Sequence, residues 1–168
     1  MASFLNDEQT ALTEEIAALL TQRGEKVAVA ESTTGGLISA ALLSVAGASR
    51  YYAGGGVFYT LGSRTALGGV PASRYENYQG TTPEMLAELA ESVRQKLGAE
   101  WCIGESGLAG PTPGRSGAPP GRTTIGVAGP VSRVEVFETG SNDRAANMIE
   151  FLTLALRFLG AAVKEAGA

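Results

Sequence analysis

Short apolar runs of strand length alternate with helical patterns along most of this chain, and this alternation limits the possible folds. The run at residues 26–30 is bounded by turn residues and predicts a buried strand. A turn at 31–36 and a helical pattern at 37–45 follow it directly. The other predicted strands cover residues 54–59, 101–104, 122–128 and 131–137, of which the last two form a hairpin. The pattern predicts an α/β fold, namely a three-layer α/β/α sandwich with a mixed sheet.

Capping residues and glycines set the expected helix boundaries. Asn6 or Asp7 begins a helix that Gly24 ends, and Thr81 or Thr82 begins another. The remaining helices are expected at residues 63–67 and 143–164, whereas 69–80 and the glycine- and proline-rich stretch 105–121 are expected to be irregular. No linker or internal repeat interrupts the chain, so residues 1–168 are expected to form a single domain.

The composition is most useful for the chemistry that it excludes. The chain has no histidine and only one cysteine, Cys102, so the usual general base and the commonest metal ligand are missing. We therefore expect no metal and no cofactor. The net charge of −4 and the lack of a basic run argue against nucleic-acid binding. The polar N-terminus and the lack of a membrane-length apolar run predict a cytoplasmic protein that does not bind membranes.

Two segments are candidates for a ligand site. The turn at 31–36 starts a helix, where free backbone N–H groups suit a phosphate, a carboxylate or a developing oxyanion. Ordinary helix capping and tight packing would explain the same residues. The segment 105–111 follows a predicted strand and opens the long loop. Because parallel sheets bind ligands at the carboxyl ends of their strands, both segments are expected at one site. The alternative is that the loop is only a flexible surface excursion.

Four motifs, two of them in these segments, resemble the C-terminal domain of the CinA (competence/damage-inducible protein A) family. The sequence AESTTGG at 30–36 is similar to the family motif AES[CT]TGG, and SGLAGP at 106–111 is similar to [ST]GIAGP. Residues 45–59 resemble its glycine-rich segment that ends in tyrosine, and Asp143-Arg144 resembles its Asp-Arg pair. The motifs follow the family order from about residue 10 to 160. The resemblance also implies a homodimer.

The resemblance implies a metal-independent amidohydrolase that acts on a pyridine nucleotide. Its reaction converts nicotinamide mononucleotide to nicotinic acid mononucleotide and ammonia. It implies that Ser32 is the nucleophile, that Tyr59 positions or relays the proton, and that Ser106 lies at the substrate. The residues expected to bind the substrate are Glu31, Thr34, Gly35, Gly36, Glu105, Gly107, Ala109, Gly110 and Arg144, the last as a clamp for phosphate or substrate.

The chain departs from the family pattern at the catalytic base. The family has lysine five residues after the tyrosine, whereas this chain has Arg64 five residues after Tyr59. A desolvated lysine can be neutral near pH 7, but an arginine stays protonated and cannot accept the Ser32 proton. Loss of general-base assistance costs about 10²–10⁴-fold in rate. The standard activity is therefore expected to be weak or lost. The alternative is a catalytically silent module that binds a pyridine nucleotide or another phospho-ligand.

Other charged residues keep two interpretations at this stage. Glu105 replaces an apolar or small family residue, and our hypothesis is that it pairs with Arg64; the alternative is a solvated carboxylate. Glu31 is a candidate substitute base or a partner for backbone groups. Arg115 and Arg122 are candidates for phosphate binding or for simple exposure to solvent.

Overall fold

The computed structural model describes residues 2–167. Its α-helices and strands are α1 (Asp7–Arg23), β1 (Val27–Glu31), α2 (Leu37–Leu43), β2 (Tyr52–Val57), α3 (Leu61–Ala66), α4 (Pro83–Leu97), β3 (Trp101–Leu108), β4 (Arg122–Ala128), β5 (Arg133–Glu138) and α5 (Arg144–Ala166). Single turns of 3₁₀ helix cover Ala48–Arg50 and Ala72–Tyr75. The predicted order of elements is confirmed, although several boundaries move by a few residues.

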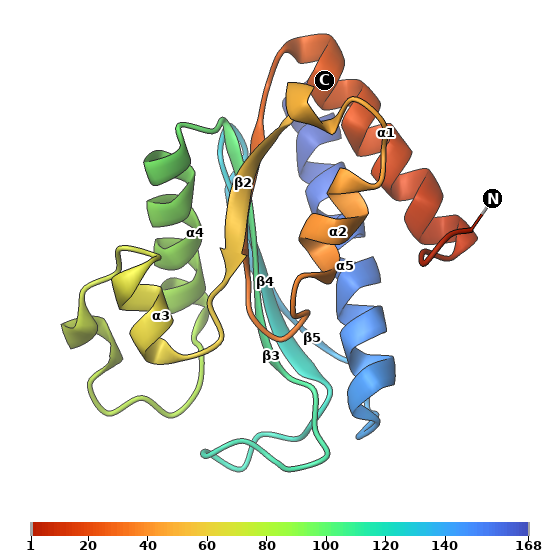
Figure 1. The fold of residues 1–168 in the computed structure, drawn as a ribbon. Helices are drawn as coiled ribbons and strands as arrows, with labels where there is room; N and C mark the ends of the chain where they lie inside the picture. Colours follow the sequence, from red (N-terminus) through yellow and green to blue (C-terminus); the bar gives the residue numbers. More distant parts are fainter. Residues whose placement is uncertain (1, 168) are drawn as a thin grey trace.

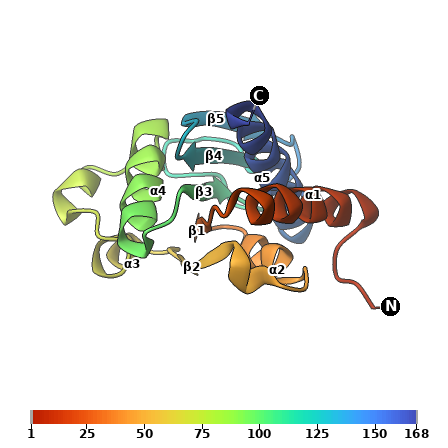
Figure 2. The same cartoon turned by 90° about the horizontal axis from the view of Figure 1, so that it is seen from above.

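The strands form one sheet in the order β2-β1-β3-β4-β5. Strand β1 pairs in parallel with β2 and β3, and β4 is antiparallel to both β3 and β5. Helices α1, α2 and α5 cover one face of the sheet, and α3 and α4 lie on the other (Figures 1 and 2). The predicted three-layer α/β/α sandwich with a mixed sheet is confirmed.

The central strand β1 is buried on both faces. Val27 and Val29 belong to the core beneath α1, α2 and α5, and Ala28 and Ala30 to the core on the α4 side. This split follows from the alternation of side chains along a strand. A central parallel strand buried in this way holds the turn after Glu31 at a fixed place.

Strand β3 is longer than the sequence pattern predicts. Residues 105–108 were expected to open a loop, but they continue the strand because β4 pairs with them as far as Leu108 opposite Arg122. The expectation was wrong because glycines within the segment are typical of loops, whereas hairpin pairing overrides that tendency. Glu105 and Ser106 are therefore held by a rigid sheet.

Helix α5 is the one helix of the described residues that is long and apolar enough to cross a membrane. This helix differs from the expectation that the chain has no apolar run of membrane length. In the fold, 61% of its most apolar window is buried inside the protein, against the sheet and α1. This burial identifies α5 as a core helix.

The glycine-rich strand β2 lies very close to β1. A Cβ at Gly55 would lie 2.3 Å from the Val29 carbonyl oxygen, whereas a Cβ at Gly62 in α3 would meet no atom within 4 Å. We expect Gly55→Ala to lower the free energy of unfolding by about 1–3 kcal/mol, because overpacked sites must shift backbone. Gly62→Ala is the control and is expected to be neutral or stabilising. Equal midpoints of urea unfolding for the two variants would contradict this assignment.

Candidate active site

Ser32 lies on the turn between β1 and α2. Its side chain is 3% exposed, and Oγ donates a hydrogen bond to the carbonyl oxygen of Phe58 at 3.0 Å. The Phe58 amide in turn donates to the carbonyl of Glu31, which extends the pairing of the parallel strands β1 and β2. The serine hydroxyl is therefore fixed at the carboxyl ends of two strands, where α/β sheets carry their ligand sites.

Arg64 is buried and connects the two serines. Its Nε donates to the Phe58 carbonyl at 3.2 Å. Its Nη2 lies 2.8 Å from Ser106 Oγ and 3.4 Å from Ser32 Oγ. Only 3% of the arginine is exposed. The structure thus brings together Ser32, Arg64 and Ser106, as the motifs predicted, with a permanently charged guanidinium on the nucleophile candidate.

Three further residues complete this polar network. Thr81 Oγ1 accepts a hydrogen bond from Arg64 Nη1 at 2.9 Å and lies 2.8 Å from Ser106 Oγ. Tyr78 OH lies 3.0 Å from the same threonine oxygen, and the Tyr75 ring centroid is 5.9 Å from Arg64 Cζ. Thr81 had been considered only as a helix cap. Because its neighbour in sequence caps α4, Thr81 is free to serve the site.

Glu105 binds the turn and makes no ion pair with Arg64. Its carboxylate accepts hydrogen bonds from Thr34 N at 2.8 Å, Ser32 N at 3.4 Å, Thr34 Oγ1 at 3.0 Å and Thr123 Oγ1 at 2.9 Å. Burial raises the pKa of this carboxyl, although these hydrogen bonds oppose the shift. The pairing hypothesis was wrong because Glu105 and Ser106 are neighbours on β3 and point to opposite faces of the sheet.

Glu31 also binds the start of α2. Its carboxylate accepts hydrogen bonds from Gly36 N at 2.9 Å, Ile38 N at 3.1 Å, Ser39 N at 3.0 Å and Thr34 Oγ1 at 2.7 Å. It therefore acts as a partner for backbone groups, one of the two interpretations left open, and makes no hydrogen bond to the Ser32 hydroxyl. Glu31 and Glu105 together occupy most of the N–H groups that were expected to bind an external anion. The protein's own carboxylates fill that part of the predicted anion site.

Tyr59 lies at the rim of the site. It is 58% exposed, and its hydroxyl accepts a hydrogen bond from Arg144 Nη2 at 3.2 Å. Arg144 Nη1 donates to the Gly110 carbonyl at 2.8 Å. Tyr59 makes no hydrogen bond to Ser32, so the structure does not bring these two side chains together in direct contact.

Gly35, Gly107 and Ala109, which were also expected to bind the substrate, contribute to the structure of the site through their backbone. Thr33 Oγ1 donates to the Gly107 carbonyl at 2.9 Å and accepts from its N–H at 2.8 Å, which joins the turn to β3. The Ala109 carbonyl accepts from Asn147 Nδ2 at 2.9 Å. Gly35 has a left-handed φ of 62°, a conformation that glycine adopts without strain.

The two loop arginines differ in their surroundings. Arg115 Cζ lies 5.7 Å from the ring centroid of Tyr78, at the edge of the site. Arg122 is exposed to solvent, as one of the two interpretations expected, and it pairs with Glu138 at 3.7 Å on the hairpin.

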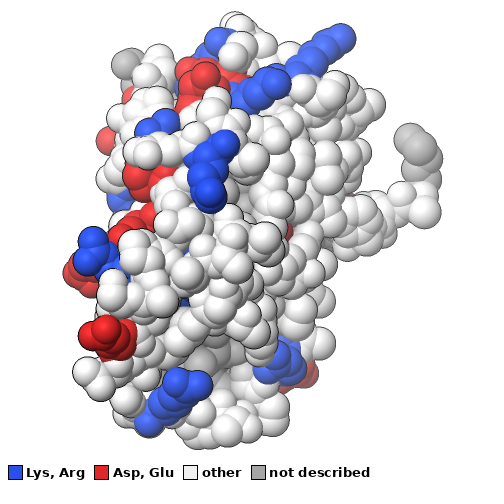
Figure 3. All heavy atoms as spheres, turned by 60° about the vertical axis from the view of Figure 1, so that its left-hand side comes forward, with Lys and Arg blue, Asp and Glu red and all other residues white. Residues whose placement is uncertain are grey.

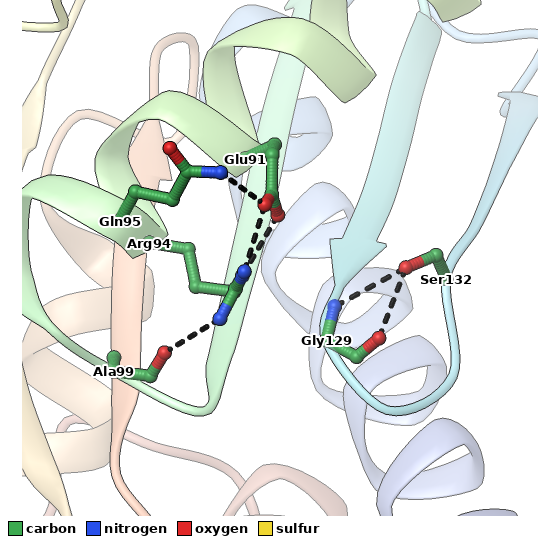
Figure 4. A network of polar contacts seen from close by, with 6 residues as sticks. All are labelled: Glu91, Arg94, Gln95, Ala99, Gly129 and Ser132. Atoms are coloured by element: carbon green, nitrogen blue, oxygen red, sulfur yellow. Dashed lines mark hydrogen bonds and ion pairs between the residues drawn. The ribbon is translucent and has the colours of Figure 1, made fainter.

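A separate hollow of about 460 Å³ lies between α4 and the β4–β5 hairpin. Arg94 on its wall pairs with Glu91 at 2.7 Å, and Ser132 Oγ bonds to the backbone of Gly129 (Figure 4). Gly129 packs against Trp101 at the start of β3, whereas Ser106 is near the other end of that strand. This hollow is therefore separate from the serine site.

Residues 2–167 contain no group of three or more His, Cys, Asp or Glu side chains that could hold a metal ion. Burial raises the pKa of the Cys102 thiol.

On the side of the molecule that carries α3 and α4, positive and negative side chains are interspersed along one border, next to a wide area without charged residues (Figure 3).

The fold and the site define an α/β domain with a buried serine at a strand-to-helix turn, held by an arginine and a second serine. The chain belongs to the CinA C-terminal domain family, whose model matches residues 9–163. It is 36% identical over 143 residues to a CinA-like protein of Parasynechococcus marenigrum, with 85% of this chain and 34% of that protein covered. A putative competence-damage inducible protein of Halothermothrix orenii is 35% identical over 84% of this chain and 34% of its own length. The chain thus spans about a third of the length of these curated relatives.

Solved structures agree with this assignment. A CinA superfamily protein of Klebsiella pneumoniae superimposes with a TM-score of 0.87 at 25% identity, covering 94% of this chain and 98% of that one. The competence/damage inducible protein CihA of Agrobacterium tumefaciens gives a TM-score of 0.87 at 26% identity, covering 96% and 99%. The resemblance found in the motifs is confirmed at the level of the family.

Proposed function

We propose that this chain is a relative of the nicotinamide-nucleotide amidohydrolases that binds a pyridine nucleotide but hydrolyses its carboxamide weakly or not at all. The observation that carries the proposal is the hydrogen bonding of Arg64, whose Nη2 donates toward both Ser32 Oγ and Ser106 Oγ. A nucleophilic serine needs an adjacent group that accepts its proton. Arginine cannot do this, because its guanidinium stays protonated and only donates hydrogen bonds.

The other acids near the serine offer no replacement. The carboxylates of Glu31 and Glu105 are occupied by N–H groups and threonine hydroxyls, and neither makes a hydrogen bond to Ser32 Oγ. The acceptor for the Ser32 proton is the Phe58 carbonyl, which is not a useful base. These contacts favour the silent binding module over an active amidase. The proposal includes a homo-oligomer, as the family resemblance implies, and a cytoplasmic location, as the sequence composition led us to expect.

Ammonia release from nicotinamide mononucleotide tests the proposal. We expect the wild-type protein to release ammonia no faster than Ser32→Ala, because the serine lacks a base. The two proteins are compared at equal concentration, after circular dichroism has shown that both are folded. Release by the wild type about 10²-fold or more above that of Ser32→Ala would refute the loss of activity and restore the amidase.

A further inference from the structure

The arginine at the centre of the site has no acidic partner. Within residues 2–167, ion pairs to carboxylates are made by Arg74, Arg94, Arg122, Arg133 and Arg157. Arg64 makes none, and its hydrogen-bond acceptors are the Phe58 carbonyl and three hydroxyls. A buried cation held only by neutral groups is costly, because these groups do not replace its hydration fully. Binding of an anion beside Arg64 would offset this cost.

Two more arginines, which make no ion pair with any residue of 2–167, lie around the same site. Arg115 stacks on Tyr78, whose hydroxyl contacts the threonine that binds Arg64. Arg144 contacts Tyr59, the residue after the carbonyl that accepts from both Ser32 and Arg64. Thus one arginine is buried, and two others belong to the loop and the helix start at the rim.

A buried hydroxyl next to Arg64 also lacks an acceptor. Tyr75 is 7% exposed, and its hydroxyl has no hydrogen-bond partner among the described residues, although its ring lies 5.9 Å from the Arg64 guanidinium carbon. Hydroxyls and guanidinium N–H groups can all donate to a carboxylate, which only accepts. A carboxamide presents an NH₂ group, which carries two donors. These N–H groups would face the N–H and O–H donors of the site with no acceptor between them.

We propose that the site selects an acid rather than an amide: a planar carboxylate at Arg64, Ser32 and Ser106, with a phosphate monoester toward Arg115 and Arg144. This inference rests on the proposed function and names its ligand as the deamidated nucleotide. The exchange of lysine for arginine makes the positive charge at this site permanent, and a permanent cation favours a carboxylate over a neutral amide. The neighbouring acids Glu31 and Glu105 do not fill this place, since their carboxylates bind the turn and the start of α2.

Titration calorimetry with nicotinic acid mononucleotide, nicotinamide mononucleotide and inorganic phosphate tests the proposal on the wild-type chain. We expect the acid nucleotide to bind about 10–100-fold more tightly than the amide, the range that a hydrogen bond to a charged group provides. Inorganic phosphate is expected to bind more weakly than the acid nucleotide. Ammonia is measured in the same samples, so that any hydrolysis of the amide is detected.

Two substitutions locate the preference. Arg64→Gln is expected to remove the preference for the acid, and Arg50→Gln is expected to preserve it. Arg50 is exposed, makes no ion pair within residues 2–167 and lies beside α1, remote from the serines. Arg144→Gln at the rim is expected to weaken acid and amide about equally, because both carry the phosphate. If Arg64→Gln does not fold, the wild-type comparison and Arg144→Gln decide.

Equal affinity for acid and amide in the wild type would overturn the proposal. So would a preference for the acid that survives in folded Arg64→Gln, or inorganic phosphate binding as tightly as the acid nucleotide. The proposed function fails by a different result, namely Ser32-dependent release of ammonia. The two failures are therefore distinguishable.

Discussion

Replacing Glu105 by leucine is expected to lower the free energy of unfolding by about 3 kcal/mol. The carboxylate accepts from the backbone N–H groups of Ser32 and Thr34 and from the hydroxyls of Thr34 and Thr123. Leucine would leave both N–H groups buried without acceptors, at about 1–3 kcal/mol each. The hydroxyls can turn to other acceptors more easily. Urea unfolding followed by circular dichroism measures the loss.

Glu105→Gln is the matched control, because its amide oxygen can still accept from the turn while its NH₂ group can donate to Thr123. We expect it to retain most of the wild-type stability at neutral pH. Full loss in Glu105→Gln would contradict the account, since it would mean that the negative charge, and not the acceptor, holds the turn. No loss in Glu105→Leu would contradict it as well.

The free energies of unfolding of the wild type and of Glu105→Gln should depend differently on pH. Burial raises the pKa of Glu105 above its ordinary value of 4.5, so the folded protein holds this proton to higher pH than the unfolded chain does. The stability that the protonated form provides is present below about pH 4.5 and is lost as the pH rises through the folded pKa. Glu105→Gln cannot ionise, so it should gain stability relative to the wild type as pH rises. A difference that stays constant from pH 4 to 8 would contradict this sign.

The sequence alone predicted most of the fold, because its signals are local. Most elements are specified by signals that act within a few residues. These signals are short apolar runs, glycines that end helices, and N-cap residues such as Asn6. The extension of β3 to Leu108 depended on pairing with β4, which is a contact between distant segments. Propensity within residues 105–108 could not reveal that pairing.

The site was predictable to the extent that its motifs were recognisable. The convergence of Ser32, Arg64 and Ser106 agreed with the order of the motifs. The contacts of Glu105 were not predictable, because the side of a strand to which a residue points depends on its register in the sheet. The role of Thr81 was not predictable either. Thr81 and Thr82 follow each other, and the sequence favours both equally as the cap of α4.

Arg64→Lys is the substitution with the largest expected effect on activity. A lysine in this position would be nearly surrounded by neutral acceptors, the Phe58 carbonyl and the hydroxyls of Thr81 and Ser106. Burial favours the neutral amine, which can accept a proton from the adjacent Ser32 hydroxyl. General-base assistance is worth about 10²–10⁴-fold. We expect an effect at the lower end of this range.

Ammonia release by Arg64→Lys on nicotinamide mononucleotide is the most direct measurement of whether Arg64 silences Ser32. We predict a rate about 10²-fold above that of the wild type, which is lost again in the double variant Ser32→Ala/Arg64→Lys. A folded Arg64→Lys protein that remains as inactive as the wild type, or a gain that persists without Ser32, would contradict the account.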